Sequence, residues 1–234
     1  MQTLPELLRG NPYPGRGVAL GRSADGKRSV AVYFIMGRSE NSRNRIFAET
    51  EDGIRTQAFD EGKMTDPSLI IYHPVRLLPN GLLVVTNGDQ TDTLRDFIAQ
   101  GKCYRHALLT RTFEPDGPNW TPRISGVLKP DGSYNLSILK SADPEGSCCQ
   151  RFFFEYEKAI SGAGHFISTY ETDGDPLPSF RGEPRPFALG DEPARELAEK
   201  VWEALDGNNK VSLFVRTIAL ETGEADTAII NRHQ

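Results

Sequence analysis

The stretch of the chain best equipped to bind an anion is residues 37–45, which read Gly-Arg-Ser-Glu-Asn-Ser-Arg-Asn-Arg. It follows directly on the apolar run of residues 30–36, so it is expected at the end of a strand. Guanidinium groups bind phosphate or carboxylate through two parallel hydrogen bonds. The stretch therefore predicts an anion-binding loop, although a solvated hairpin loop is the more frequent use of such a run. The candidate residues in it are Arg38, Ser39, Arg43, Asn44 and Arg45.

A second candidate region combines Tyr72, in a Tyr-His-Pro sequence, with residues 86–92, which read Thr-Asn-Gly-Asp-Gln-Thr-Asp. The latter stretch closes a predicted strand and opens a predicted helix. The first turn of a helix presents free backbone N–H groups, so Asn87 and its neighbours are placed to bind an anion or the polar edge of a base. Capping of the helix by Asp89 or Thr91 explains the same residues equally well. The two roles are compatible.

A third candidate is Glu114, which precedes a Pro-rich stretch that leads into Arg123. A carboxylate whose charge is tuned by a nearby arginine can act as a general acid or base. A lone glutamate is more often a surface residue, so residue type alone favours that role for Glu114.

Several other kinds of site are not predicted. The four histidines lack the short spacing of a zinc site, and the three cysteines fit neither a disulfide framework nor a zinc spacing. No Gly-x-Gly-x-x-Gly or Walker sequence is present, which argues against a dinucleotide fold and a P-loop. The candidate residues therefore point to a small anionic ligand, with no metal implied.

The composition indicates a soluble globular protein that acts in the cytoplasm. Of 234 residues, 38% are hydrophobic and 25% charged, and the net charge of -5 disfavours a nucleic-acid partner. The apolar run of residues 30–36 is far shorter than the roughly 18 residues of a transmembrane helix. Pro5 and Glu6 stand where a signal peptide would be continuously apolar. We therefore expect neither nucleic acid nor a membrane as partner.

The elements that must position the candidate residues are predicted mainly as β-hairpins. Asp-Gly, Asn-Gly or Thr-Gly pairs at residues 25, 52, 80, 131 and 222 separate short β-rich runs. Two segments have a helical period instead: residues 192–205, with Asp191 as N-cap, and residues 91–100, extending towards Leu108. This pattern predicts an α+β fold with helices on the faces of antiparallel sheets. Residues 176–186 have the composition of a linker, but one domain over residues 1–234 with a long loop is the simpler interpretation.

Taken in order, the candidate residues resemble the archaeal-type inosine monophosphate (IMP) cyclohydrolase family over most of the chain. The motifs that carry the resemblance are Tyr-Pro-Gly-Arg-Gly at residues 13–17, Gly-Arg-Ser at 37–39, Ser-Arg-Asn-Arg at 42–45, Tyr72, Asn-Gly at 87–88, Thr-Asp at 91–92 and Thr-Pro-Arg-Ile at 121–124. Each motif is weak by itself, and the resemblance rests on their order and spacing.

The resemblance implies a four-layer α/β/β/α sandwich like that of the N-terminal-nucleophile hydrolases. It also implies closure of the second purine ring of 5-formamidoimidazole-4-carboxamide ribonucleotide to give IMP and water, with no metal or redox cofactor. Self-processing relatives of that architecture expose Cys, Ser or Thr as the first residue, whereas this chain starts Met1-Gln2-Thr3. An N-terminal nucleophile is therefore not expected, which disfavours an amidohydrolase.

The resemblance and the chemistry of the residues together imply roles for the candidates. Arg38 and Tyr72 are expected to polarise the formyl or carboxamide oxygen, and Glu114 to carry a proton. The residues expected to bind phosphate, sugar or base are Arg16, Ser39, Arg43, Asn44, Arg45, Asn87 and Arg123. The alternative is a non-catalytic purine-nucleotide-binding or sensing protein with the same fold. Exposed sheet edges are compatible with a homo-oligomer, but the sequence does not determine the number of subunits.

Overall fold

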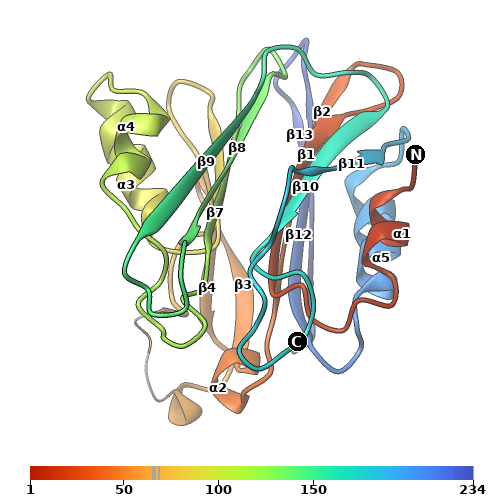
Figure 1. The fold of residues 1–234 in the computed structure, drawn as a ribbon. Helices are drawn as coiled ribbons and strands as arrows, with labels where there is room; N and C mark the ends of the chain where they lie inside the picture. Colours follow the sequence, from red (N-terminus) through yellow and green to blue (C-terminus); the bar gives the residue numbers. More distant parts are fainter. Residues whose placement is uncertain (65–66, 68, 234) are drawn as a thin grey trace.

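The chain folds into two antiparallel sheets with helices on their outer faces in the computed structural model, which describes residues 1–64, 67 and 69–233 (Figure 1). Within this part of the chain, one sheet has six strands in the order β11-β10-β1-β2-β12-β13, and the other has seven in the order β3-β4-β5-β6-β7-β8-β9. Neighbouring strands pair antiparallel in both sheets. The α+β class predicted from the sequence is confirmed.

The elements have the following bounds. The six-stranded sheet contains β11 (Arg185–Ala188), β10 (Ala163–Ser168), β1 (Arg16–Arg22), β2 (Arg28–Met36), β12 (Lys210–Ala219) and β13 (Ala225–Asn231). The seven-stranded sheet contains β3 (Arg45–Thr50), β4 (Gly53–Ala58), β5 (Val75–Leu77), β6 (Leu83–Thr86), β7 (Arg123–Leu128), β8 (Tyr134–Ser141) and β9 (Cys149–Tyr156). The helices are α1 (Leu4–Leu8), α2 (Glu40–Arg43), the 3-10 turn η1 (Glu61–Lys63), α3 (Gln90–Ala99), α4 (Tyr104–Leu109) and α5 (Ala194–Ala204).

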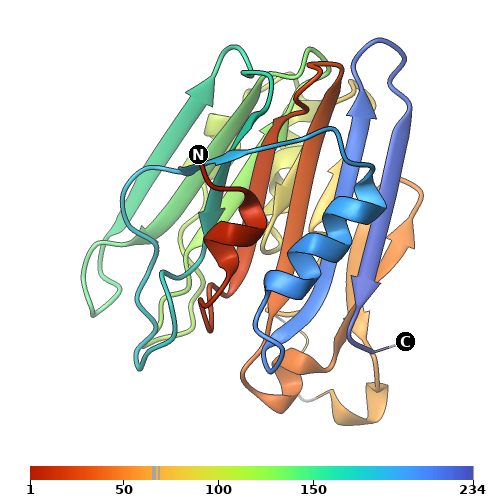
Figure 2. The ribbon, with the colours of Figure 1, turned by 90° about the vertical axis from the view of Figure 1, so that its right-hand side faces the viewer.

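Apolar side chains pack in three layers across this arrangement. In β2, Tyr33 and Ile35 face the core between the sheets, whereas Phe34 and Met36 face the core under α1 and α5. Side chains alternate along a strand, and both faces of β2 are covered, which explains why its sequence is apolar without a break. On the other side of the molecule α3 and α4 cover the seven-stranded sheet, with Leu94 of α3 in a third apolar cluster. Figures 1 and 2 show the two sheets face to face between these helices.

The predicted hairpins are confirmed where a glycine turn joins neighbouring strands. Residues 51–52 join β3 to β4, residues 78–82 join β5 to β6, and residues 129–133 join β7 to β8. Gly132 has φ 84°, a left-handed conformation that glycine adopts without steric cost. The β-rich run before the Asp25-Gly26 turn is β1, whose bounds could not be predicted because glycines and arginines interrupt its apolar pattern.

The predicted N-cap of the last helix is wrong. The helix α5 begins at Ala194 after Pro193, and the free N–H of Ala194 donates to Asp226 Oδ2 at 3.0 Å. Asp191 instead accepts the backbone N–H of Asp25 at 2.8 Å, in a loop far away along the chain. A tertiary contact therefore supplies the cap that local sequence was expected to supply.

The helix predicted from residue 91 does not extend towards Leu108. The structure has two helices there, since α3 ends at Ala99 and α4 begins at Tyr104. Gly101 lies between them with φ 73°, which ends the first helix.

Candidate residues from both sheets meet at one end of the sandwich, the lower end in Figure 1, where α2 lies. In the six-stranded sheet β1 begins with Arg16, which pairs with Ile35 near the end of β2. In the seven-stranded sheet β7 begins with Arg123, just beyond the pairing of Ser125 with Thr86 at the end of β6. Antiparallel pairing brings the start of one strand beside the end of its neighbour. Segments far apart in the chain therefore supply one region.

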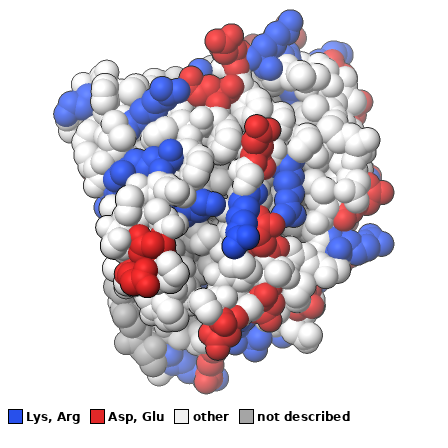
Figure 3. Space-filling view, viewed as in Figure 1, with Lys and Arg blue, Asp and Glu red and all other residues white. Residues whose placement is uncertain are grey.

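No helix in the described part of the chain has the length and apolarity needed to cross a membrane. On the face shown in Figure 3, basic and acidic side chains are interspersed. That face therefore carries no continuous basic surface of the kind that tracks a nucleic-acid backbone.

Candidate functional site

Glu114 is the only carboxylate of a buried polar group that we call the Glu114 cluster. The cluster, within the described part of the chain, consists of Arg16, Tyr33, Arg45, Tyr72, Asn87 and Glu114. Glu114 itself is 1% exposed, and its backbone N–H donates to Thr121 O at 2.9 Å, which closes the Pro-rich loop that follows. Asn87 Nδ2 donates to Glu114 Oε1 at 3.3 Å.

The environment of Glu114 tunes it for proton transfer near neutral pH. Burial raises the pKa of its carboxyl group from the ordinary 4.5 to about 6, while the charges of Arg16 and Arg123 act in the opposite direction. Glu114 Oε2 lies 3.8 Å from Arg16 Nη2 and has no hydrogen-bond partner in the described part of the chain. An acid with this pKa populates both protonation states near pH 6, as a general acid or base requires.

Arg16 presents a second buried group with unused bonding capacity. It is the first residue of β1, and its backbone N–H donates to Thr169 Oγ1 at 3.1 Å. Gly15 precedes it with φ 78°, and a Cβ at Gly15 would lie 2.2 Å from Thr169 Oγ1, so glycine is required there. Burial disfavours the charged form of Arg16, but the Glu114 carboxylate and the neighbouring tyrosines act together in the opposite direction, and the pKa of Arg16 is raised well above its usual value. Arg16 Nε has no hydrogen-bond partner among the described residues.

Tyr72 and Tyr33 form a hydroxyl pair. Their hydroxyl oxygens are 2.8 Å apart, in a hydrogen bond that either can donate. Burial, followed by the proximity of Tyr72, raises the pKa of Tyr33 well above its usual range, so its phenol stays neutral. The backbone N–H of Tyr72 donates to Thr56 Oγ1 at 2.8 Å, which holds the residue beside β4. One of the two hydroxyl hydrogens is used between the tyrosines, and the other remains for a ligand.

Arg45 is a buried cation without a carboxylate partner in the described part of the chain. It is 1% exposed at the start of β3, and its guanidinium donates to two carbonyls, Ser42 O at 2.8 Å and Met36 O at 3.3 Å. Its Nη1 has no hydrogen-bond partner in the same part of the chain. Burial lowers the pKa of Arg45, with Tyr72 and Arg16 among its electrostatic neighbours. An anionic ligand group would compensate this buried charge.

Asn87 follows β6 of the seven-stranded sheet, and Arg123, at the start of β7, flanks the cluster as an electrostatic neighbour of Glu114. Asn87 is fully buried and accepts the backbone N–H of Ile124 at 2.8 Å, so its amide is fixed. Arg123 Nη1 lies 2.7 Å from Asp89 Oδ1. A Cβ at Gly88 would lie 2.5 Å from Arg123 Nη1, so a side chain there would displace this arginine.

The turn that opens α3 does not use its acidic residue as a cap. Asp89 is the N-cap residue by position, but its side chain makes no capping hydrogen bond. Its carboxylate pairs with Arg111 and Arg123 instead. The predicted capping by Asp89 is therefore wrong, because two arginines compete for the carboxylate. Thr91 donates its hydroxyl to Gly88 O at 3.0 Å, within the same turn.

Arg38 lies at the edge of the site and is 38% exposed at its side chain. Its Nη1 donates to Asp173 Oδ1 at 2.7 Å and to Gly174 O at 2.9 Å. Its guanidinium also lies over the ring of Tyr13, 5.2 Å from the centroid. Arg38 thus connects the end of β2 with the long loop that follows β10.

Three further predicted residues have their polar atoms bonded within the chain. Ser39 Oγ accepts the backbone N–H of Ser42 at 3.1 Å and caps α2. Arg43 donates to a backbone carbonyl at 2.8 Å and to an asparagine oxygen at 3.0 Å. Asn44 exchanges two hydrogen bonds with the backbone of Asp60, at 2.7 and 2.8 Å. These bonds shape α2 and the approach to β3.

Sequence reasoning missed Tyr33 and Tyr170. Tyr170 shares a short hydrogen bond, 2.5 Å between oxygens, with Thr121, and it is an electrostatic neighbour of Arg16. A signal for Tyr33 was present, because it is the one residue with a polar side-chain group in the apolar run of residues 30–36. No comparable signal exists for Tyr170, which reaches the site from a distant part of the chain.

The cluster as a whole carries more positive than negative charge. Arg16 and Arg45 are cationic and Glu114 is the one acid, while Arg123 is matched by Asp89. Buried donors on Arg16 and Arg45 and a buried acceptor on Glu114 have no hydrogen-bond partner in the described part of the chain. Such an arrangement can hold an oxygen-rich ligand, stabilise negative charge on its oxygens and move a proton.

Comparison with known proteins finds a family and several relatives that this chain resembles. Residues 13–223 match the family model described as IMP cyclohydrolase-like protein. The IMP cyclohydrolase of Methanopyrus kandleri is 31% identical over 183 residues, which cover 72% of this chain and 89% of the relative. The IMP cyclohydrolase of Methanococcus maripaludis strain C7 is 34% identical over 164 residues, 68% of this chain and 75% of the relative. That of Halobacterium salinarum strain R1 is 32% identical over 133 residues, 55% and 63% of the two chains. Because the family model matches most of the chain, and two of these relatives are more than 30% identical over more than two thirds of it, the chain belongs to the IMP cyclohydrolase-like family.

Proposed function

We propose that the protein is a cyclohydrolase that closes the purine ring of 5-formamidoimidazole-4-carboxamide ribonucleotide to give IMP and water. The observation that carries the proposal is a buried carboxyl group, Glu114, with a pKa of about 6 beside two buried arginines that keep unused donors. The identity of 31–34% to archaeal IMP cyclohydrolases supports the same activity.

The reaction needs proton transfer and charge stabilisation more than a nucleophile from the protein. The carboxamide nitrogen attacks the formyl carbon, forming the N–C bond as the C=O π bond opens, and a proton lost from that nitrogen converts the formyl oxygen into a hydroxyl. That hydroxyl then leaves as water when its C–O bond breaks and a nitrogen proton is lost. Glu114 takes the nitrogen proton and returns it to the leaving oxygen, so it ends in its starting state. Holding the two reacting groups together supplies much of the acceleration.

Tyr72 and Arg38 stabilise the charge that develops on the formyl or carboxamide oxygen. The hydroxyl hydrogen that the tyrosine pair does not use is available to this oxygen. Arg38 joins it by exchanging its bond to Asp173 for one to the substrate. Arg16 and Arg45 hold anionic oxygens of the ribonucleotide, since the guanidinium groups of Arg43 and Arg123 are already bonded within the chain.

The proposal extends to the setting of the site. The fold has helices on the outer faces of two facing sheets. We propose that this is the four-layer sandwich of the N-terminal-nucleophile hydrolases. The chain then forms one domain over residues 1–234 that acts in the cytoplasm on a small purine nucleotide, with Asn87 orienting the base or sugar.

The test is a spectrophotometric assay of IMP formation from the formamido ribonucleotide. Clear turnover is expected for the wild-type protein. Tyr72→Phe should lower kcat by about 100-fold, the usual loss of one preorganised donor, with the Kd of IMP changed by less than about threefold. Tyr104→Phe is the matched control, because that hydroxyl bonds to Glu155 on the surface. Tight nucleotide binding without turnover would identify a sensing protein and reject the enzyme, and normal kcat in Tyr72→Phe would reject the role of Tyr72.

A further inference from the structure

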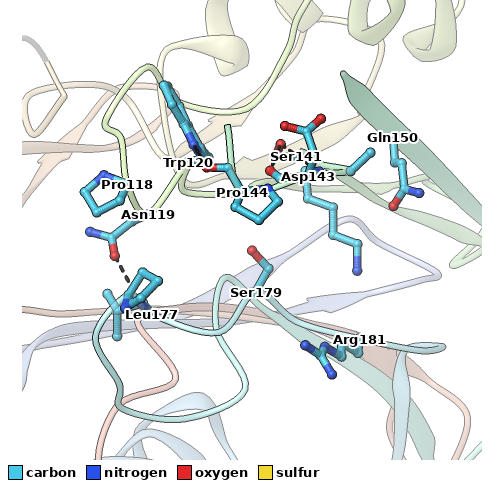
Figure 4. Close-up of a pocket in the computed structure, with 13 residues that line it drawn as sticks. Pro118, Asn119, Trp120, Ser141, Asp143, Pro144, Gln150, Leu177, Ser179 and Arg181 are labelled. Carbon is cyan, nitrogen blue, oxygen red and sulfur yellow. Dashed lines mark hydrogen bonds between the residues drawn. The ribbon is translucent and has the colours of Figure 1, made fainter. Parts of the chain in front are cut away.

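A cavity of about 430 Å³ lies beside the Glu114 cluster but shares no residue with it (Figure 4). It is bounded by the loop of residues 118–120, by the ends of β8 and β9 with the turn between them, and by the loop of residues 176–181. Asn119 Oδ1 accepts the backbone N–H of Leu177 at 3.0 Å and joins two of these walls. In Figure 4 Ser179 and Arg181 rise from the lower wall, and Asp143 and Gln150 lie on the upper one.

Two cations line this cavity, and neither is paired with a carboxylate in the described part of the chain. Lys140 donates only to a backbone carbonyl, Phe180 O at 2.7 Å. Arg181 is exposed, and its guanidinium has no hydrogen bond or ion pair to any described residue. Burial, followed by the positive charge of Arg181, lowers the pKa of Lys140. The two cations therefore repel each other across the cavity, and an anion between them would remove that repulsion.

Two carboxylates near these cations, Asp143 and Glu171, are hydrogen-bonded to other groups. Asp143, which lines the cavity, accepts two backbone N–H groups at 3.0 Å on Oδ1 and the hydroxyl of Ser147 at 2.8 Å on Oδ2. Glu171 accepts the backbone N–H of Arg181 and pairs with Arg185. Asp143 keeps its own negative charge, and Glu171, which is paired with Arg185, acts on Lys140 in the direction opposite to Arg181. The charged side chains that line the cavity are Lys140, Arg181 and Asp143, so the lining carries two positive charges and one negative charge.

The cavity is large enough for an organic molecule that carries an anionic group. Apolar rings and side chains, those of Pro118, Pro144, Pro176 and Leu177, stand beside neutral hydrogen-bonding groups such as Ser179. A volume of about 430 Å³ is within the range of pockets that hold small organic ligands. Paired basic side chains suit a dianionic phosphate, and the apolar wall suits an organic body attached to it.

We propose that this cavity is a binding site for a small phosphate monoester, separate from the Glu114 cluster, with Lys140 and Arg181 holding the phosphate. The inference does not depend on the reaction proposed above, because the cavity is lined by other residues. A phosphate ester bound there would touch Asn119 and the loop that carries Asp173, the partner of Arg38.

The chain offers a local reporter for the test. It has two tryptophans, of which Trp120 lines the cavity and Trp202 lies on α5 at the far side of the six-stranded sheet. In a Trp202→Phe background, titration with ribose 5-phosphate should give a saturable change in Trp120 fluorescence. Replacing Lys140 and Arg181 together by Met should raise the Kd roughly tenfold or more, through loss of two charge-assisted contacts.

A matched control removes two charges elsewhere. The double variant Arg195→Met, Lys200→Met acts on exposed positions of α5 and should leave the Kd within about twofold. An equal loss in both double variants would show only general charge attraction and overturn the site. Arg16→Met should leave the titration unchanged. If the fluorescence change were lost in Arg16→Met, ribose 5-phosphate would be binding at the Glu114 cluster instead of in the cavity. Inorganic phosphate should bind more weakly than ribose 5-phosphate, and equal affinity would overturn the monoester as the ligand.

Discussion

Two neighbouring polar regions at the lower end of the sandwich share arginine, asparagine and glutamate but use them differently. In residues 39–44, side chains form hydrogen bonds with the backbone of the chain itself. The hydroxyl of Ser39 caps α2, and the amide of Asn44 bonds to the backbone of Asp60. In the Glu114 cluster, buried donors and acceptors on Arg16, Arg45 and Glu114 have no hydrogen-bond partner in the described part of the chain. Unused bonding capacity, rather than residue type, therefore separates the groups that build the fold from those available to a ligand.

The contrast is sharpest between two arginines that are two residues apart. Arg43 bonds to the carbonyl of Gly37 and to Asn209, and so ties the β2–α2 connection to the loop before β12. Arg45 is buried at the start of β3 with its Nη1 unpartnered in the same part of the chain. Arg43 therefore holds two loops together. Arg45 brings a charge without a carboxylate partner into the core, which is unfavourable unless a ligand compensates that charge.

The largest effect is expected when the acid of the cluster is made neutral. Glu114→Gln keeps the shape of the side chain but removes proton transfer, so kcat for IMP formation should fall by about 1,000-fold. The Kd of IMP should change little, because the amide can still accept the bond from Asn87. Steady-state kinetics and a binding titration measure the two quantities separately. Glu199→Gln, on the exposed face of α5, is the control and should leave kcat unchanged; a comparable kcat in both variants would place catalysis outside the Glu114 cluster.

The opposite result is expected in the structural region. Asn44→Ala breaks two hydrogen bonds to the backbone of Asp60 and leaves that N–H and C=O without their partner. The free energy of unfolding should fall by about 2 to 3 kcal/mol, measured by urea denaturation. The kcat of the folded variant should stay within about threefold of wild type. A large loss of kcat with unchanged stability would move Asn44 into the binding site and erase the contrast between the two regions.

The fold could be predicted from local signals wherever a turn and its strands are neighbours in the chain. The Asp131-Gly132 turn and the apolar run of residues 30–36 illustrate this, because their residues determine their own conformation. The cap of α5 could not be predicted, since Asp226 reaches it from another strand. The break between α3 and α4 was signalled by Gly101, but the periodicity on both sides of it masked that signal.

The site could be predicted as a set of segments but not as a set of contacts. Arg16, Tyr72 and Glu114 come from three motifs in the sequence, and the structure brings them into one cluster. Nothing in the sequence distinguishes Arg43 from Arg45, because the difference appears only in the fold. Arg43 bonds to Asn209 from a distant part of the chain, and Arg45 is buried with its Nη1 unpartnered among the described residues. The hydrogen bond between Tyr33 and Tyr72 likewise joins β2 to the segment before β5 and has no local signature.

The pH dependence of stability tests whether Glu114 is as desolvated as its burial indicates. Its pKa is raised from 4.5 to about 6 in the folded protein, so folding favours the protonated form. Its contribution to stability is therefore fully present below pH 4.5 and is lost as the pH rises through about 6. At about 1.4 kcal/mol per pH unit, wild type should lose about 2 kcal/mol relative to Glu114→Gln over this range. Urea denaturation of both proteins at pH 4.5 and pH 7.5 gives this difference, because all other groups titrate alike in the pair; a constant difference would mean that Glu114 is solvated.

The smallest effect is expected at Ser39, a candidate by sequence whose hydroxyl caps α2 in the structure. Ser39→Ala removes the acceptor for the backbone N–H of Ser42, a loss of about 1 kcal/mol for a helix cap. Ser39→Asp keeps a capping acceptor and should restore most of that stability, whereas it would repel a phosphate bound at the same place. If the hydroxyl belongs to the fold alone, both variants bind IMP with a Kd within about twofold of wild type. A Kd that rises strongly in Ser39→Asp but not in Ser39→Ala would show that the nucleotide phosphate approaches α2, and the boundary between the two regions would then run through this helix.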